Sequence, residues 1–203
     1  MRSDLKETFG DIDIYLFDQL LKGRFDACRT VLDAGCGSGR NLIYFLQQQY
    51  NVYGIDQDAA AVREVREIAQ QLAPHLPPGN FRVGQMEDLP FPENYFDLVI
   101  CSAVLHFARD QQHFDQMIRS VWRVLKPGGY LFARLASSIG LEHLIQDLGN
   151  GRYYLPDGSE RFLVNEELLL QYTRDLNGEL FEYLKTTNVQ NLRCMTTWCL
   201  QKI

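Results

Sequence analysis

The sequence predicts a doubly wound α/β domain, in which a mostly parallel sheet carries helices on both faces. Three observations lead to this fold class: short apolar runs alternate with amphipathic helical stretches, a glycine-rich turn follows the first run, and the fourth run is almost wholly apolar. Alternating strands and helices favour parallel strands joined by right-handed crossovers. A strand covered on both faces shows no polar alternation. A chain of 203 residues suits one such domain, and we expect a single domain over residues 1–203.

The first half of the chain is predicted to supply four strands. Residues 11–22 favour a helix within an N-terminal helical cap over residues 1–28. The stretch "NLIYFLQQQY" and the one that Asp58 can cap have apolar residues at helical spacing, and "PHLPP" stops the second helix. The strands are predicted at "TVLDA", "NVYGI", "NFRVG" and "FDLVICSAV".

The second half continues the alternation and then breaks it. A helix is predicted from about Asp110, "KPGG" ends it, and "YLFARLA" is the fifth strand. Residues 137–164, rich in glycine and proline turns, are the candidate for an insertion on the substrate side of the sheet. Asn165 caps a last helix, and "ELFEYLKTTNV" and "RCMTTWCLQK" predict a hairpin at the sheet edge, joined around Gln190 and Asn191.

Composition narrows the class of protein. The net charge of −6 and the pI of about 5.2 argue against a nucleic-acid partner. The five cysteines are odd in number and contain no C-x-x-C pair, so we expect reduced thiols, no disulfide framework and no metal site. No signal peptide and no run of roughly 20 apolar residues is evident, which predicts a cytoplasmic protein without a membrane segment.

The glycine-rich turn "LDAGCGSGRN" indicates the ligand. Gly35, Gly37 and Gly39 let the backbone turn sharply and approach a ligand closely, but Arg40 stands where a dinucleotide fingerprint has its last glycine. Asp33, at the end of the first strand, would repel a pyrophosphate and favour a ligand with positive charge. S-adenosylmethionine has a sulfonium and an amino group and no phosphate.

Two more acids follow the next strands of the predicted sheet. Asp56 ends the second strand, about 20 residues after the turn, where a carboxylate accepts hydrogen bonds from ribose hydroxyls. Asp88 follows the third strand and can accept from the adenine amino group, although Glu87 beside it could take that role. Because parallel strands end at one edge, the three acids should converge on one cleft.

These motifs resemble those of class I S-adenosylmethionine-dependent methyltransferases, of the type 11-like small-molecule group that includes ubiquinone-biosynthesis and tellurite-resistance methyltransferases. The matching segments, between about residues 30 and 136, are "LDAGCGSGRN", "GIDQD", "EDLPF" and "VLKPGGYLFA". The resemblance implies a Rossmann-like seven-stranded sheet with an antiparallel last strand. It also implies S-adenosyl-L-methionine as cofactor, S-adenosyl-L-homocysteine as product and these cofactor-binding positions: Asp33, Gly35, Cys36, Gly37, Asp56, Gln57, Met86, Glu87, Asp88 and Ser102. Within that loop we assign the Cys36 side chain to packing.

The acceptor side is predicted from fewer signals. His106 follows the fourth strand and is the candidate general base, or else it orients its loop. Arg134 interrupts the apolar fifth strand, so it either pairs with a protein acid or awaits an anionic substrate. Phe9 and Tyr15 near the N-terminus, and Arg152, Tyr153, Tyr154 and Arg161 in the insertion, are further candidates for substrate contact.

The predicted reaction is in-line transfer of the sulfonium methyl group to a small-molecule acceptor, whose reacting atom the sequence leaves open. Alternatives are methylation of RNA or protein, and a non-catalytic S-adenosylmethionine-binding subunit. A nucleotide-dependent oxidoreductase would share the fold, but Asp33 and the incomplete dinucleotide pattern argue against it.

Overall fold

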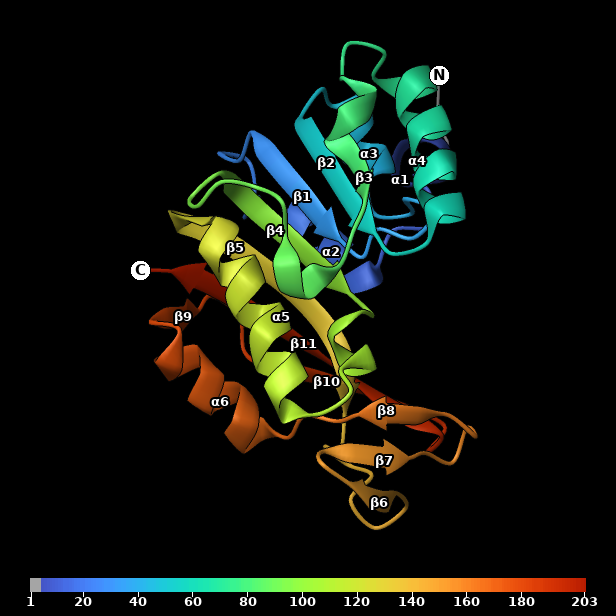
Figure 1. Ribbon diagram of the computed structural model, residues 1–203, viewed down its shortest axis with the longest axis vertical. Helices are drawn as coiled ribbons and strands as arrows, with labels where there is room; N and C mark the ends of the chain where they lie inside the picture. Colours follow the sequence, from blue (N-terminus) through green and yellow to red (C-terminus); the bar gives the residue numbers. More distant parts are fainter. Residues whose placement is uncertain (1–4) are drawn as a thin grey trace.

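The computed structural model describes residues 5–203; the first four residues of the predicted N-terminal cap lie outside the described residues. The main sheet has eight strands in the order β10-β11-β5-β4-β1-β2-β3, with β9 paired to β11 (Figure 1). Their bounds are β1 (Thr30–Ala34), β2 (Asn51–Asp56), β3 (Phe81–Val83), β4 (Phe96–Ser102), β5 (Leu125–Ser137), β9 (Gly178–Leu180), β10 (Lys185–Val189) and β11 (Arg193–Lys202).

The pairing of these strands confirms the predicted doubly wound fold. Strands β3, β2, β1, β4 and β5 run parallel, and the last strand, β11, is antiparallel to β5. The seven strands of the path match the expected number, and the short β9 is an eighth, formed by the start of a segment that was predicted as one strand. The chain leaves β1 in one direction towards β2 and returns on its other side as β4, so a crevice opens at the carboxyl ends of these strands.

Helices cover both faces of the main sheet. Residues of β4 alternate between two cores, with Val99 and Cys101 in one and Leu98 and Ile100 in the other. The first core includes residues of α5 and α6, and the second includes residues of α2, α3 and α4, which is the layering seen in Figure 1. The helices are α1 (Leu5–Phe9), α2 (Ile14–Leu21), α3 (Ile43–Gln47), α4 (Ala59–Leu72), α5 (Gln111–Val124) and α6 (Glu166–Asp175), with short 3₁₀ turns η1 (Pro78–Asn80), η2 (Met86–Asp88) and η3 (Leu105–Phe107).

The predicted helix starts at Asp58, Asp110 and Asn165 are confirmed. Each of the three side chains accepts a hydrogen bond from a backbone amide of the first turn, at 2.8, 2.7 and 2.8 Å. A cap of this kind contributes about 1 kcal/mol to stability. The first predicted helix, residues 11–22, is α2, which starts at Ile14 because Asp13 caps it, and the separate short helix α1 precedes it. The helix expected from "NLIYFLQQQY" has only five residues, Ile43–Gln47.

Two segments fold differently from the prediction. The "KPGG" segment follows the end of α5 as expected, but it lies inside β5, where a register shift next to Phe96 accommodates it. The predicted insertion contains a second, antiparallel sheet of β6 (Gln146–Gly149), β7 (Arg152–Tyr154) and β8 (Glu160–Phe162). The buried Phe162 stacks on Phe114 of α5 at 5.1 Å between ring centroids, which anchors this small sheet to the domain.

The end of the chain forms the predicted edge hairpin. Strands β10 and β11 are antiparallel, and Gln190 and Asn191 between them have left-handed φ angles of 53° and 57°. The predicted first strand, residues 179–189, is split into β9 and β10, which both pair with β11. No helix within residues 5–203 is both long enough and apolar enough to cross a bilayer.

Candidate active site

A cavity of about 550 Å³ opens at the carboxyl ends of β1, β2 and β4. It is larger than the second cavity, which lies beside it and is described below, and we call it the glycine-loop cavity. The structure brings seven of the ten predicted cofactor residues onto its walls: Gly35, Gly37, Asp56, Gln57, Met86, Glu87 and Ser102. Asp33, Cys36 and Asp88 are not among its lining residues.

The glycine loop is shaped by packing on one side and left open on the other. Gly35 has a φ of +80°, and a Cβ there would lie 2.3 Å from a Cγ of Val104, so any side chain would clash. A Cβ on Gly37, at φ +49°, would meet no atom within 4 Å. Gly35 is therefore required by the fold, whereas Gly37 leaves space that a ligand can occupy.

Asp56 is fixed on the cavity wall by backbone amides. One carboxylate oxygen accepts from the Gly37 amide at 2.8 Å and the other from the Asp58 amide at 2.9 Å. This joins the ends of β1 and β2 in one geometry. Each oxygen keeps a further lone pair, so the carboxylate can still accept from hydroxyl groups in the cavity.

Asp33 lies behind the glycine loop and is 1% exposed. Neither of its carboxyl oxygens has a hydrogen-bond partner among residues 5–203. Burial raises the pKa of Asp33 to about 8; Arg40 opposes this shift and Asp56 adds to it. An unpaired buried carboxyl group is costly unless a positive charge comes near, so this site fits a cationic ligand better than a phosphate.

Cys36 is buried in the second core, and burial raises the pKa of its thiol. Its Sγ would lie 3.1 Å from a Cβ placed on Gly54 of β2. These surroundings agree with the packing role assigned to its side chain and give it no nucleophilic character.

On the opposite wall, Glu87 rather than Asp88 faces the glycine-loop cavity. Asp88 is exposed, whereas Glu87 lines the cavity and its Oε1 lies 3.1 Å from Nε2 of His113. The other ring nitrogen of His113 accepts from the Arg109 amide at 3.1 Å, so the proton of the neutral ring is on the side of Glu87. Sequence reasoning missed His113, which was visible only as a polar residue in the first turn of a helix.

A buried acid from the N-terminal helices connects β4, β5 and the segment that follows the glycine loop. Asp13 is 3% exposed, and its Oδ2 accepts from Ser102 Oγ and from Arg134 Nη1, both at 3.2 Å. The same oxygen lies 3.6 Å from Nη2 of Arg40. Of the two alternatives for Arg134, the structure shows the protein acid. Arg134 Nε, however, is buried without a partner among residues 5–203.

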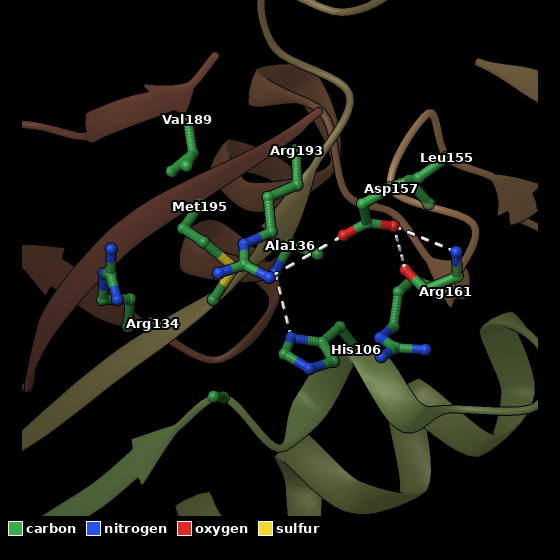
Figure 2. A pocket seen from close by; sticks show the side chains of 11 residues that line it. His106, Arg134, Ala136, Leu155, Asp157, Arg161, Val189, Arg193 and Met195 are labelled. Atoms are coloured by element: carbon green, nitrogen blue, oxygen red, sulfur yellow. Dashed lines mark hydrogen bonds and ion pairs between the residues drawn. The ribbon is translucent and has the colours of Figure 1, made fainter. Parts of the chain in front are cut away.

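A second cavity, of about 270 Å³, lies beside the first, and we call it the arginine cavity (Figure 2). Its walls come from η3, β5, β10, β11 and the β7–β8 turn, so the insertion contributes directly to it. The polar lining residues are His106, Arg134, Asp157, Ser159, Arg161 and Arg193, and the apolar ones are Ala103, Ala136, Leu155, Val189 and Met195.

Ala103 lines both cavities. It has a left-handed φ of 63°, which is unusual for a residue other than glycine. Its amide donates to the carbonyl of Arg134 at 2.7 Å, which holds this conformation in place. Strain of this kind, of order 1–3 kcal/mol, is typical of functional sites.

His106 is held with one nitrogen towards the main chain. Its Nδ1 accepts from the Ala136 amide at 3.2 Å. Burial, with Arg161 and Arg193 nearby, lowers its pKa to about 4, so the ring is neutral at pH 7. The proton of the neutral ring is then on Nε2, which favours hydrogen-bond donation over proton abstraction.

Tyr15 and Arg152 line neither cavity. The Tyr15 ring lies 5.2 Å from the Arg134 guanidinium, and its hydroxyl contacts Thr187 Oγ1, so it supports Arg134 from behind. Arg152 donates to the Ala108 carbonyl at 3.1 Å and lies 3.5 Å from Glu160, which ties the small sheet to the loop after η3. Their predicted contact with substrate stays a prediction.

Residues 32–133, half of the chain, match the methyltransferase domain family. The chain belongs to the class I S-adenosylmethionine-dependent methyltransferases. This methyltransferase is 37% identical over 101 residues to an uncharacterized methyltransferase of Synechocystis sp., covering 50% of this chain and 44% of the relative. It is 34% identical over 107 residues to the uncharacterized methyltransferase YcgJ of Bacillus subtilis, covering 50% and 40%. The chain thus matches less than half the length of these curated relatives.

Solved structures extend the similarity in fold to nearly the whole chain. The PH0226 protein of Pyrococcus horikoshii superposes with a TM-score of 0.72 at 20% identity, covering 94% of this chain and 89% of that one. The 1,6-didemethyltoxoflavin-N1-methyltransferase of Burkholderia thailandensis has a TM-score of 0.71 at 18% identity, covering 98% and 81%. That structure holds 1,6-didemethyltoxoflavin and S-adenosylhomocysteine. The cofactor of the family is S-adenosylmethionine.

Proposed function

We propose that this methyltransferase transfers the methyl group of S-adenosylmethionine by in-line displacement to a small-molecule acceptor. The observation that carries the proposal is the pair of adjoining cavities that share Ala103. The glycine-loop cavity would hold the cofactor and the arginine cavity the acceptor. The Burkholderia neighbour, which is named for a small molecule and binds it together with S-adenosylhomocysteine, supports the same assignment.

The residues of the glycine-loop cavity fit the parts of this cofactor. The open space at Gly37 would receive its methionine part, with the Asp33 carboxyl group behind the loop favouring the positive charge. Asp56, with Gln57 beside it, would accept from the ribose hydroxyls, and Glu87 would accept from the adenine amino group. When bound, S-adenosylmethionine supplies an activated methyl group on a sulfonium, which departs as a neutral thioether.

Positioning is the main catalytic contribution that we propose for the protein. Holding the acceptor atom in line, about 3 to 3.5 Å from the methyl carbon, is worth several kcal/mol. Ala103 presents a single methyl side chain at the junction and so leaves room for that approach. His106 would donate a hydrogen bond from Nε2 and orient the acceptor, which requires an acceptor that arrives deprotonated or has a free lone pair.

The alternatives are less well supported. RNA methylation would call for a positive surface, and the net charge is −6. A non-catalytic cofactor-binding subunit has no use for a second cavity beside the first. A cytoplasmic location also remains our proposal, and it agrees with five buried cysteines that form no disulfide.

The test is a calorimetric titration of the purified protein with S-adenosylhomocysteine, with NADH in parallel, followed by a transfer assay with S-adenosylmethionine. We expect the former ligand alone to bind. The Asp56→Ala variant should bind it about 10- to 100-fold more weakly, from the loss of charge-assisted hydrogen bonds worth about 1.5 to 3 kcal/mol. The exposed Asp175→Ala variant is the control and should bind it normally. Binding of NADH alone would replace this proposal with an oxidoreductase.

A further inference from the structure

We propose that the arginine cavity binds an acceptor through an oxyanion, so that the substrate class is a small carboxylate or similar anion with an apolar body. This inference rests on the proposed function. It specifies the chemical group by which the cavity would recognise its acceptor. Neither the family nor the names of its members define that group for this chain.

Positive charge gathers in the arginine cavity from three separate strands. Arg134 lies on β5, Arg161 on β8 and Arg193 on β11, and all three line the cavity. Asp157 is the only acid among the lining residues that the structure describes, and it lies 3.8 Å from Arg193. Because Asp13 behind Arg134 is shared with Arg40, the walls keep an excess of positive charge in a protein whose net charge is −6.

The donors of these side chains are only partly satisfied. Arg134 Nε is buried without a partner among residues 5–203, although Nη1 of the same group is paired with Asp13. The Arg161 guanidinium lies 5.0 Å from the centre of the Phe107 ring, and its Nη1 donates a hydrogen bond to the Glu160 carbonyl. Its Nε and Nη2 take no part in that hydrogen bond. A carboxylate can accept hydrogen bonds from such guanidinium N–H groups, and its negative charge offsets their positive charge.

His106 reinforces the selection of an anion. It lines the same cavity, and its neutral ring carries the proton on Nε2, so it adds a donor and no negative charge. Figure 2 shows His106 and the three arginines around one space, with Arg134 on the side opposite Arg161. A cationic amine would find donors and positive charge there, with Asp157 as its only anionic partner on the described walls.

The remaining walls define the rest of the acceptor. Ala136, Leu155, Val189 and Met195 offer apolar surface beside the guanidinium groups. A volume of about 270 Å³ admits a small molecule, and a folded nucleic acid or protein segment is too large for it. The acceptor that fits is therefore amphipathic, with its anionic group on the arginines and its reacting atom towards Ala103.

The test measures the binding of matched acids and amides to the protein saturated with S-adenosylhomocysteine. The probes are benzoate, 4-hydroxybenzoate and phenylacetate, each compared with its uncharged primary amide by calorimetry. We expect at least one acid to bind about ten-fold or more tightly than its amide, because a charge-assisted hydrogen bond is worth that factor. Arg193→Gln should remove most of this preference, and Arg174→Gln on the exposed face of α6 should retain it.

Three results would overturn the inference: no acid binds, acids and amides bind equally, or Arg193→Gln and Arg161→Gln both keep the full preference for the acid. Normal affinity of these variants for S-adenosylhomocysteine shows that they are folded. A protein that binds S-adenosylhomocysteine and fails the acid test keeps the proposed function and loses this inference. A protein that binds no S-adenosylhomocysteine loses the proposed function, and the acid titration is then read on the unliganded protein.

Discussion

Replacing Asp33 by asparagine should stabilise the unliganded protein at neutral pH. Burial raises the pKa of this carboxyl group from the ordinary 3.8 to about 8. In the folded protein the carboxyl group therefore stays protonated while the unfolded chain ionises. The stability that protonation gives is fully present below pH 3.8 and is lost as the pH rises towards 8. At pH 7, roughly three pH units above the ordinary pKa, the loss in free energy of unfolding amounts to about 4 kcal/mol, at about 1.4 kcal/mol per unit.

The assay is urea unfolding of wild type and Asp33→Asn at several pH values between 5 and 8. The free-energy difference between the two proteins should grow with pH in favour of the variant, by about 3 kcal/mol between pH 5 and pH 7. All other titrating groups are common to both proteins, so the difference isolates Asp33. A difference that stays constant over this range would refute the burial argument. The same variant should bind S-adenosylhomocysteine more weakly, as expected where a destabilised group serves ligand binding.

Two further predictions concern the residues around the glycine-loop cavity. Gly35→Ala should lower the free energy of unfolding by about 2 to 5 kcal/mol, because the left-handed strain of about 1 to 2 kcal/mol adds to the clash of a Cβ 2.3 Å from a valine carbon. Gly37→Ala should cost only that strain and weaken cofactor binding. Urea unfolding and calorimetry separate the two effects, and equal loss of stability in both variants would contradict this account. Asp13→Ala should destabilise by about 3 kcal/mol, because it removes both the cap of α2 and the partner of Arg134. Asp13→Asn keeps the cap and should lose less; an Asp13→Ala protein as stable as wild type would show that the acid is dispensable.

Local signals predicted the order of elements and several of the residues that line the glycine-loop cavity. Helix caps such as Asp58 and Asn165 act on amides two or three residues away, so the sequence alone reveals them. The glycines and Asp56 could also be placed, because parallel strands deliver their carboxyl ends to one edge. The start of β5 was harder to predict, since "KPGG" follows the end of a helix and here also belongs to a bulged strand.

Features that depend on distant pairs could not be predicted. Asp13 meets Ser102 and Arg134 across 89 and 121 residues of sequence, and no local pattern marks such a partner. The small sheet was missed because its strands are short and its first strand, Gln146–Gly149, is exposed throughout and has no alternation to detect. Arg193 was not a candidate, since it only becomes part of a cavity when β11 pairs beside β5.

The family match contains Ala103 and His106 of the arginine cavity but none of its arginines. It ends at residue 133, directly before Arg134, while Asp157, Arg161 and Arg193 all come later in the chain. Under the proposed function, substitutions after residue 133 would therefore change the acceptor side and leave the residues of the glycine-loop cavity intact. The β7–β8 turn is the easiest place for such change, because β7 and β8 pair only within the small sheet and not with the main one. Similarity to other methyltransferases over residues 32–133 therefore accounts for the methyl donor, and under the proposed function the later residues of the arginine cavity would select what is methylated.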